Sequence, residues 1–417
     1  MTRTTGSGSS RRARGIAAEE MRRHNLATVL GHVHLRGSAS RSQLTSLTGL
    51  NRSTVADLIG ELTELGLVTE SPGVAVAGPG RPSPVVNIRS EGAVVLAVEM
   101  SVDSIAAATI GLGGHIFNHV RIARPRGHFE PEATVRDISE LARPLLAALP
   151  AGHTLVAIGA AVVGVVRRHD GFVHIAPNLG WRNLPLGALL DKELGLGVPI
   201  RIANDADLGA LGEYRRGGYG GTSDLVFISG EVGIGCGVIS DGKPLLGAAG
   251  YAGEAGHMMV NPKGRACRCG ATGCWETEAG EEPLLRRVAS VSATSGLAAV
   301  DAVAALAAAG DEQTLRAIAE TGLWLGIGIS NLINIFNPEV VILGGLYHRL
   351  FDHVYEAVCD GAGRAFAAPF DMVEIQPSTL GVNGELIGAA ELALAELIND
   401  PARVAITATA GMRTDVP

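Results

Sequence analysis

The stretch that decides the fold is His257–Glu276, HMMVNPKGRACRCGATGCWE. Within it, His257, Cys267, Cys269 and Cys274 span eighteen residues and include three of the chain's five cysteines. One imidazole and three thiolates form the ligand set of a closed, four-coordinate zinc site. Because the protein itself would fill all four positions, no position remains for an activated water, and the pattern predicts a structural Zn²⁺.

Two other interpretations of these cysteines stay open. They could be unliganded thiols in a glycine-rich turn, or two of them could form a disulfide. The chain shows no secretory signal, and disulfides are rare in reducing compartments. The short spacing also suits a metal better than a disulfide framework, so zinc is the favoured prediction.

Two glutamates flank the cysteine run. Glu254 precedes it in GYAGEAGH, and Glu276 follows it in CWETEAG. A metal clip would hold both carboxylates close together, and paired carboxylates accept charge-assisted hydrogen bonds from sugar hydroxyls. The alternative is that both are ordinary surface glutamates.

The composition is that of a globular α/β protein. The chain has 417 residues, 47% of them hydrophobic, with 56 glycines and 19 prolines, which suggests two or three domains. Apolar runs such as Ala93–Val98 and Leu155–Val166 have strand length and are too short to span a bilayer. The N-terminal arginines precede no apolar leader, so we expect a cytoplasmic protein with no membrane partner.

The charge is distributed unevenly along the chain. Residues 1–90 contain eleven arginines, no lysine and six acidic residues, a net charge of +5. The whole chain carries −8, so the remainder carries −13. A small basic segment before a large acidic one predicts that only the N-terminal part meets a polyanion such as DNA.

We expect a disordered tail over residues 1–16 and a winged helix-turn-helix over residues 17–90. An apolar stripe at helical spacing predicts a first helix from about Ala17 to Val33. Ser40–Gln43 has the capping-box pattern of a second helix, which would bury Leu44 and Leu47. Asn51 can cap a third helix that ends at Gly66.

The expected DNA contacts lie on the second and third helices and on the wing. The first residues of a recognition helix reach base edges, and strands at Leu67–Glu70 and Pro84–Ile88 would form the wing. A small helical domain that binds protein is the alternative. The predicted DNA-contacting residues are Arg41, Arg52, Ser53, Thr54 and Arg81.

The region from residue 91 to about 400 repeats one pattern. Strands are predicted at Ala93–Glu99, Ser104–Ile110 and His115–Arg124, followed by a helix at Glu132–Leu149 and a strand at Leu155–Ala161. A second series begins with Leu225–Ser229, Ile234–Ser240 and Lys243–Gly247. The repetition predicts two related α/β lobes with a ligand cleft between them, and residues 401–417 are predicted to form a tail.

Four segments carry a resemblance to a known family. The zinc run with GYAGEAGH, IANDADLGALGE around Asn204 and Asp205, GEVGIGCGV at Gly230–Val238, and NLINIFNPEVVILGG at Asn331–Gly345 together resemble the ROK family of sugar kinases and sugar-responsive repressors. The resemblance covers nearly the whole chain apart from its two tails. It implies a two-lobed actin/hexokinase-like (ribonuclease H-like) ATPase fold, and a winged helix in front is the arrangement of the family's repressors.

The resemblance also implies a sugar site. Asp205 matches the residue that acts as base in the kinases, and His257 would place one ring nitrogen on zinc and the other toward the sugar. Asn178, in APNLGW, is a weaker candidate, since it could simply form a turn. The implied sugar-binding residues are Asn204, Asp205, Glu254, His257, Glu276 and Asn178.

One segment departs from the kinase pattern. The kinases have Asp-x-Gly-Gly-Thr where this chain has Glu99–Asp103, EMSVD, so no glycine admits a phosphate and Asp103 would repel it. Val232 stands where kinases commonly have threonine. We therefore expect no catalytic residue and no phosphoryl transfer.

The sequence thus predicts a sugar-responsive transcriptional regulator, a repressor whose kinase-like domain binds a sugar without phosphorylating it. Its expected partners are operator DNA, a small sugar or sugar derivative, and further copies of the chain in a dimer or tetramer. Two alternatives remain. One is an active glucokinase-like enzyme that carries a DNA-binding module, and the other is a repressor whose effector is a sugar phosphate.

Overall fold

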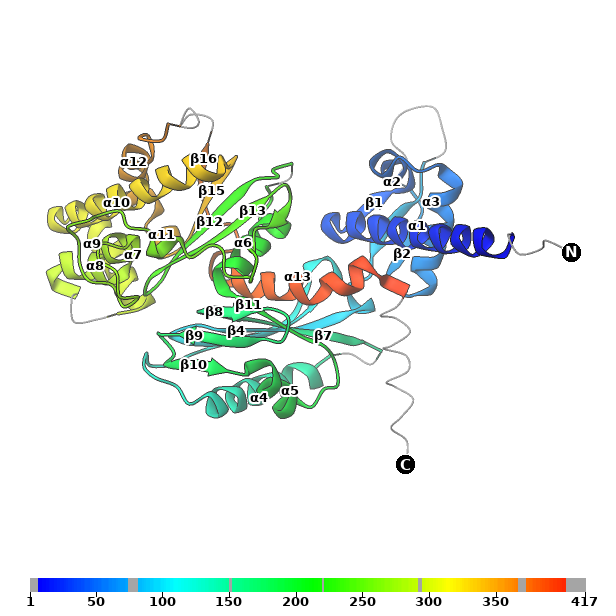
Figure 1. Cartoon of the computed structure of the whole chain (residues 1–417), viewed down its shortest axis with the longest axis horizontal. Coiled ribbons are helices and arrows are strands. Elements are labelled where there is room, and N and C mark those ends of the chain that lie inside the picture. The colour runs from blue at the N-terminus through cyan, green and yellow to red at the C-terminus, as the bar shows by residue number, and fades with distance from the viewer. Residues whose placement is uncertain are drawn as a thin grey trace, which may run out of the picture.

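The computed structural model describes residues 7–73, 82–149, 152–219, 221–291, 295–366 and 373–402. It shows an N-terminal helical unit beside two α/β lobes (Figure 1). The N-terminal unit combines three helices with a small sheet of strand order β1-β3-β2. Its elements are α1 (Ser7–Arg36), β1 (Ser38–Ser40), α2 (Arg41–Thr48), α3 (Arg52–Glu64), β2 (Val68–Ser71) and β3 (Val85–Ile88).

Local sequence signals explain the boundaries of α2 and α3. Ser40 and Gln43 form the reciprocal capping box at the start of α2, and Gly49 ends that helix with φ of 69°. Asn51 caps α3 by accepting a hydrogen bond from the backbone N–H of Thr54 at 2.9 Å. A short turn joins the two helices, and β2 and β3 pair beside them.

The structure corrects two expectations for this unit. Helix α1 begins at Ser7 and not near Ala17, because Arg and Ala between these positions favour helix and no proline interrupts them. Leu47 is 42% exposed, since it lies on the outer side of a two-turn helix whose inner side is already filled by Leu44. Arg81 lies outside the described residues.

Lobe 1 is built around a five-stranded sheet of order β11-β7-β4-β5-β6. The meander β4-β5-β6 is antiparallel, while β7 and β11 join parallel to β4. A small antiparallel sheet of β8, β9 and β10 adjoins it. Its elements are β4 (Val94–Met100), β5 (Ser104–Gly111), β6 (Ile116–Ala123), α4 (Pro131–Ala147), β7 (Leu155–Val162), β8 (Val165–Arg167), β9 (Phe172–Ala176), β10 (Trp181–Leu184), α5 (Leu186–Leu194) and β11 (Ile200–Asn204).

Lobe 2 repeats this plan with the order β14-β13-β12-β15-β16, a meander followed by two parallel strands. The predicted strand at Lys243–Gly247 is shorter than expected, because Pro244 lacks an N–H for the ladder and Gly247 turns the chain. The elements are β12 (Leu225–Gly230), β13 (Ile234–Ser240), β14 (Lys243–Pro244), α7 (Trp275–Ala279), α8 (Glu281–Arg287), α9 (Leu297–Ala308), α10 (Glu312–Phe336), β15 (Val340–Gly345), α11 (Leu346–Arg349), α12 (Phe351–Ala362) and β16 (Glu374–Pro377).

Two helices lie where the lobes meet. Helix α6 (Asp205–Arg216) packs on β12 and β13 of lobe 2, and α13 (Gly384–Asn399) packs on β4 and β7 of lobe 1. The two helices also pack on each other, and α13 extends toward the N-terminal unit (Figure 1). A Cβ on Gly388 would lie 1.8 Å from the backbone oxygen of Leu208, so only glycine permits this close approach.

One apolar core joins the N-terminal unit to lobe 1. It contains Leu30 and Val33 of α1, Val95 of β4 and Leu394 of α13, each buried. These residues come from both ends of the chain and from its middle, so the N-terminal unit is packed onto lobe 1 and does not hang from a linker.

Among the described helices, α10 is long and apolar enough to cross a membrane by length and composition. However, 56% of its most apolar window is buried inside the protein, and the core helices of soluble proteins pass the same test.

Candidate functional site

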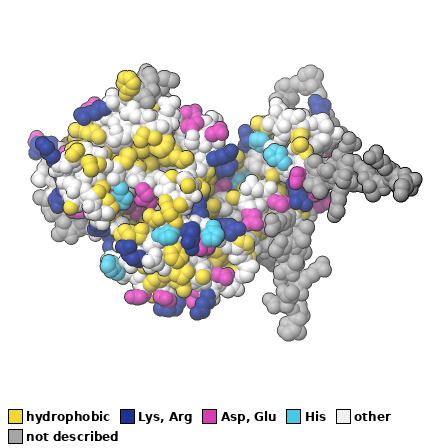
Figure 2. Space-filling model, in the orientation of Figure 1, with side chains coloured by type: hydrophobic (Ala, Val, Ile, Leu, Met, Phe, Trp, Pro, Cys, Tyr) yellow, Lys and Arg dark blue, Asp and Glu magenta, His cyan; other side chains and the backbone are white. Residues whose placement is uncertain are grey.

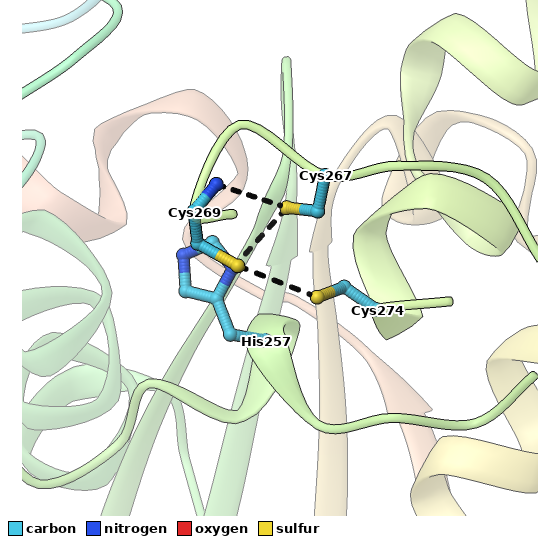
Figure 3. Close-up of side chains that lie close together, drawn as sticks. All are labelled: His257, Cys267, Cys269 and Cys274. Atoms are coloured by element: carbon cyan, nitrogen blue, oxygen red, sulfur yellow. Dashed lines mark hydrogen bonds between the residues drawn. The ribbon is translucent and has the colours of Figure 1, made fainter. Parts of the chain in front are cut away.

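The four predicted metal ligands converge at one point in lobe 2 (Figure 3). Their ligand atoms all lie within 4.8 Å of one another. The Sγ atoms of Cys269 and Cys274 are 3.6 Å apart, and Sγ of Cys267 lies 3.7 Å from Nδ1 of His257. Tetrahedral zinc with bonds of about 2.3 Å to sulfur and 2.0–2.1 Å to nitrogen needs edges of roughly 3.8 and 3.6 Å, so the residues fit a metal.

Short turns hold these ligands in place. The loop closes through Ala266 and Thr272, which form an isolated β-bridge, and Met259 pairs likewise with Cys274. Gly273 has φ of 72° and its missing Cβ would lie 1.6 Å from the carbonyl oxygen of Asn261. A glycine at this position therefore allows the loop to fold back on itself.

The three thiols differ in how readily they ionise. Burial raises the pKa of Cys267 and Cys274, whereas the backbone N–H of Ala271 lowers the pKa of Cys269. Two of the three thiols would stay protonated at neutral pH unless a positive charge were bound. A divalent cation that binds thiolates supplies that charge, which fits the donor set.

The metal loop positions one of the two flanking glutamates. The Cys267 thiol donates to Oε1 of Glu276 at 3.0 Å, and Nδ1 of His257 lies 3.6 Å from the same oxygen. Helix α7, which carries Glu276, begins directly after Cys274. Glu254 lies near enough to Glu276 that their mutual repulsion adds to the effect of burial, and both raise the pKa of Glu254.

A second group of predicted residues lies at the start of α6. Asn204 caps this helix by accepting from the N–H of Asp207, and it donates to the Gly164 carbonyl at 3.0 Å. Together with Glu254, Asn204 and Asp207 line a pocket between the lobes with a volume of about 30 Å³. That volume holds about two waters, which is less than a sugar ring requires.

Burial and crowding of negative charge raise the pKa of the carboxyl groups in this region. Burial is the main cause for Asp205, whose pKa rises to about 7 with help from the charges of Glu99 and Glu254. The pKa of Glu231 rises to about 8 for the same reasons, through burial and then the charge of Asp205. Near neutral pH these groups are partly protonated, so they can both donate and accept hydrogen bonds.

The structure places Asn178 in a different cavity. It accepts a hydrogen bond from Arg268 of the metal loop at 2.7 Å, and both residues line a cavity of about 580 Å³ between the lobes. Arg126 and Arg286 line the same cavity. Asn178 thus does not share the small pocket with Asn204 and Glu254.

Sequence reasoning missed Asp207 and Arg168 of the small pocket region. Asp207 is buried, and Nη2 of Arg168 lies 3.2 Å from its Oδ2. Burial raises the pKa of Asp207 to about 6, although the Arg168 charge opposes this rise. The sequence could have indicated Asp207, because it is the second Asp of NDAD and follows Asn204 by three residues. Residues at this spacing lie on the same side of a helix.

Ion pairs occupy the side of the cleft that contains Glu99–Asp103, the segment that stands in place of the kinase phosphate loop. Arg121 holds Glu99 through two bonds of 2.7 and 2.8 Å, and Ser101 donates to Glu231 across the lobes at 3.2 Å. Arg126 of lobe 1 binds Glu281 of lobe 2 through bonds of 2.6 and 2.8 Å. It also contacts Asp103 at 3.2 Å.

The predicted DNA-contacting residues that are described lie on the surface of the N-terminal unit. Arg52 and Ser53 are exposed at the start of α3, and Thr54 is half-buried beside them. Arg41 is bound to Glu70 of β2 through its Nε at 2.6 Å, which holds it against the wing. On the face drawn in Figure 2, acidic and basic side chains are intermingled, so no single sign of charge dominates that face.

Comparison with known proteins shows relatives of two kinds. Residues 95–396 match the profile of the ROK family. The chain is 30% identical over 377 residues to a xylose repressor of Caldicellulosiruptor bescii, covering 87% of this chain and 93% of the repressor. It also resembles the crystal structure of a ROK family transcriptional regulator, a homologue of the Escherichia coli MLC protein, with 24% identity and a TM-score of 0.75.

The kinase relatives match a smaller part of this chain. A ROK family glucokinase from Streptomyces griseus, solved with glucose and AMPPNP, is 28% identical with a TM-score of 0.63. It covers 72% of this chain and 99% of its own, whereas the regulator structure covers 94% of this chain and all of its own. With a family match over most of its length and a repressor relative that spans both the N-terminal unit and the lobes, the chain belongs to the ROK family.

Proposed function

We propose that this protein is a sugar-responsive transcriptional repressor that binds operator DNA and does not phosphorylate its sugar. One observation carries the proposal. The sugar-side residues Asn204, Asp205 and Glu254 gather at the cleft, while ion pairs and buried carboxylates fill the phosphate side. Repressor relatives that align over 87% and 89% of this chain support it.

The phosphate side is unsuited to a nucleoside triphosphate. Glu231 lies among the carboxylates of Glu99, Asp103 and Asp205, whose charges add to burial in raising its pKa. A polyphosphate brought to this side would meet further negative charge, and Arg121 and Arg126 are already bound to carboxylates. Phosphoryl transfer depends on positive charge placed around the phosphates, so the arrangement argues against it.

For the effector, we propose that Asn204, Asp205, Glu254, His257 and Glu276 bind the sugar hydroxyls. Carboxylates, an amide and an imidazole offer both donors and acceptors, as hydroxyl groups require. Asn178 is the least supported member of the set, because it lies by the larger cavity with Arg268. Asp205 would act here as a binding group.

For the metal, we propose Zn²⁺ held by His257, Cys267, Cys269 and Cys274. When bound, the ion supplies a fixed cross-link and stabilises the thiolates. Cys274 leads directly into α7 and so fixes the position of Glu276. Nδ1 of His257 faces the sulfurs, which leaves Nε2 of the same ring to donate to the sugar.

For DNA, we propose that Arg52, Ser53 and Thr54 reach base edges and that Arg41 contacts phosphate after exchanging its bond with Glu70. Arg81 on the wing, which lies outside the described residues, would contact the backbone or the minor groove. Two-fold symmetric operators call for at least a dimer, and we propose a dimer or tetramer.

The test is DNA binding with and without sugars. The purified protein first selects duplexes from a random-sequence pool, and fluorescence anisotropy then measures the affinity of a selected duplex in fixed salt with D-xylose, D-glucose or N-acetylglucosamine. We expect a selected duplex whose affinity changes with one sugar. Failure to select any duplex over random DNA would overturn the proposal.

The second candidate is a sugar kinase with an added DNA-binding module. The retained Asp205 at the cleft and the glucokinase relatives favour it. Sugar-dependent ADP formation, abolished by Asp205→Asn, would establish it. The absence of turnover in the presence of every sugar that binds would exclude it.

A further inference from the structure

The two helices at the junction of the lobes, α6 and α13, pack on the sheets of different lobes. The buried Glu213 of α6 accepts hydrogen bonds from Ser378, Thr379 and Leu380, which follow β16 of lobe 2. On another side of α6, a Cβ on Gly209 would lie 2.3 Å from the ring of Phe227 in β12. Helix α6 is therefore held to lobe 2 by packing and by a buried carboxylate, while Leu208 and Leu211 on its other side join the apolar core with α13.

The N-terminal unit is fixed to lobe 1 and α13. The His34 side chain of α1 is buried; its Nε2 lies 3.0 Å from Glu391 of α13, and its Nδ1 accepts from the N–H of Gly113 in lobe 1 at 3.0 Å. A Cβ on Gly31 of α1 would lie 3.8 Å from Cγ2 of Ile398. The last turns of α1 thus touch lobe 1 and its C-terminal helix on several sides.

One side chain bridges these two bodies. Arg216, the last residue of α6, donates from Nε to Glu391 at 2.6 Å and from Nη1 to the His34 carbonyl oxygen at 2.9 Å, and its Nη2 contacts the His34 ring. Among the described residues, every hydrogen bond between α6 or lobe 2 and the N-terminal unit comes from Arg216.

The cluster is buried and charged. The side chain of Arg216 is 12% exposed and that of Glu391 is 4% exposed. Burial alone would raise the pKa of Glu391, but the hydrogen bond from His34 and the charge and hydrogen bond of Arg216 lower it to about 2. Charge-assisted hydrogen bonds in such a place depend strongly on distance and direction, so a small shift of α6 changes them.

We propose that Arg216 couples effector binding to DNA binding by linking α6 to α1 through His34 and Glu391. The proposal rests on the proposed function and adds the route by which the sugar acts. Helix α6 has Asn204 at its cleft end and Arg216 at its other end, a rigid span of about 18 Å for twelve residues. A rotation of lobe 2 about the sugar therefore moves Arg216 against Glu391.

The contact between α6 and α13 permits that movement. A Cβ on Gly212 would lie 2.4 Å from the Gly384 carbonyl oxygen, and one on Gly388 would lie 1.8 Å from the Leu208 oxygen. The helices therefore touch along their backbones at these glycines, and Leu208 and Leu211 of α6 share one apolar core with Leu386 of α13 beside them. Small sliding of packed helices is a recognised way for one domain to move past another.

The experiment compares variants of the whole protein. Arg216→Met keeps the aliphatic stem and removes the guanidinium, and Glu391→Gln keeps the shape of its partner and removes the charge. The matched control is Arg201→Met, because Arg201 binds Glu396 of the same α13 at 2.7 Å on the exposed surface, away from α1. Calorimetry measures D-xylose and D-glucose affinity, and anisotropy measures affinity for a selected duplex with and without the sugar that binds.

The coupling is the ratio of the two duplex affinities, which in allosteric proteins is commonly 5- to 150-fold. We expect sugar affinity within about twofold of wild type for Arg216→Met and Glu391→Gln, with the ratio falling to below about twofold. Arg201→Met should keep the wild-type ratio. Where Arg216→Met fails to fold, Glu391→Gln decides alone.

The outcomes separate the two proposals. A wild-type ratio in Arg216→Met or in Glu391→Gln overturns the coupling role and leaves the repressor proposal intact. An equal loss of coupling in Arg201→Met also overturns it, because the effect would then belong to any charge on α13. A wild-type protein with no sugar effect on a selected duplex overturns the proposed function itself.

Discussion

Replacing Arg126 with methionine should destabilise the protein by about 2–3 kcal/mol. Arg126 pairs with Glu281 across the lobes, and the Glu281 side chain is only 6% exposed. Removing one partner of a buried ion pair costs about 3–5 kcal/mol because a charge is left unpaired. We take a lower value because the Gly296 N–H still donates to Glu281 at 3.0 Å and Arg126 is itself partly exposed.

A double-mutant cycle with Glu281→Gln isolates the pair. Urea unfolding of the four proteins can be followed by tryptophan fluorescence, since Trp181 lies in lobe 1 and Trp275 and Trp324 lie in lobe 2. We expect a coupling energy of about 2 kcal/mol, with the double variant more stable than the sum of single effects implies.

The control is Arg143→Met. Arg143 lies 3.9 Å from Glu193 within lobe 1 and is 72% exposed, so its loss should cost less than about 0.5 kcal/mol. A coupling energy below about 0.5 kcal/mol for Arg126 and Glu281 would refute the account of this bridge.

Three further outcomes are expected. Gly328→Ala should lower the thermal midpoint, because its Cβ would lie 2.0 Å from Trp275, although alanine favours helix over glycine by about 1 kcal/mol. Gly60 is a helical glycine with open space around it, so Gly60→Ala should raise the midpoint. The reverse order of the two midpoints would contradict the packing argument. Cys274→Ser should reduce bound zinc, measured by mass spectrometry, from one equivalent per chain and weaken sugar binding, whereas Cys359→Ser should do neither; retained zinc in Cys274→Ser would remove the ligand assignment. Burial raises the pKa of Glu231 to about 8, so the folded protein holds a proton that the unfolded chain releases above about pH 4.5. The free energy of unfolding should therefore fall as pH rises from about 4.5 through 8. Glu231→Gln should flatten this part of the curve of thermal midpoint against pH, and an unchanged slope would show that other groups cause it.

Features set by neighbouring residues could be predicted from the sequence. The capping box of α2, the Asn51 cap of α3 and the convergence of the four metal ligands all arise within short segments, where spacing alone decides the geometry. The repetition of strand runs likewise predicted two lobes, and the two five-stranded sheets have matching strand orders.

Features set by distant residues could not be predicted. His34 and Glu391 are 357 positions apart, and nothing near either residue indicates that they meet. The same holds for Arg126 and Glu281, which are 155 positions apart. Arg121 and Glu99 are only 22 positions apart, but they lie on β6 and β4, two strands that are not neighbours in the sheet. The sequence showed that glycines were missing from that segment, but only the fold brings the opposing arginines and carboxylates together.

The exposure of Leu47 and the early start of α1 show a second limit. Periodicity identifies which residues share a helix face, but a short helix such as α2 has too few turns to show how wide its buried face is. Helix ends are equally hard to place where several residues could serve as a cap, and α1 begins at Ser7 in a Ser- and Arg-rich segment.

The apolar core that joins α1, β4 and α13 has a consequence for how this architecture can be rearranged. Residues 1–90 expressed alone would expose Leu30 and Val33, which are now covered in part by lobe 1 and the last helix of the chain. Grafting these residues onto another sugar-binding domain would require that domain to supply an equivalent of α13. A recombination event that exchanged only the proposed DNA-binding part would therefore yield an unstable protein. If α3 reads the operator as proposed, operator preference should diverge by point substitution on its exposed face more readily than by exchange of whole domains.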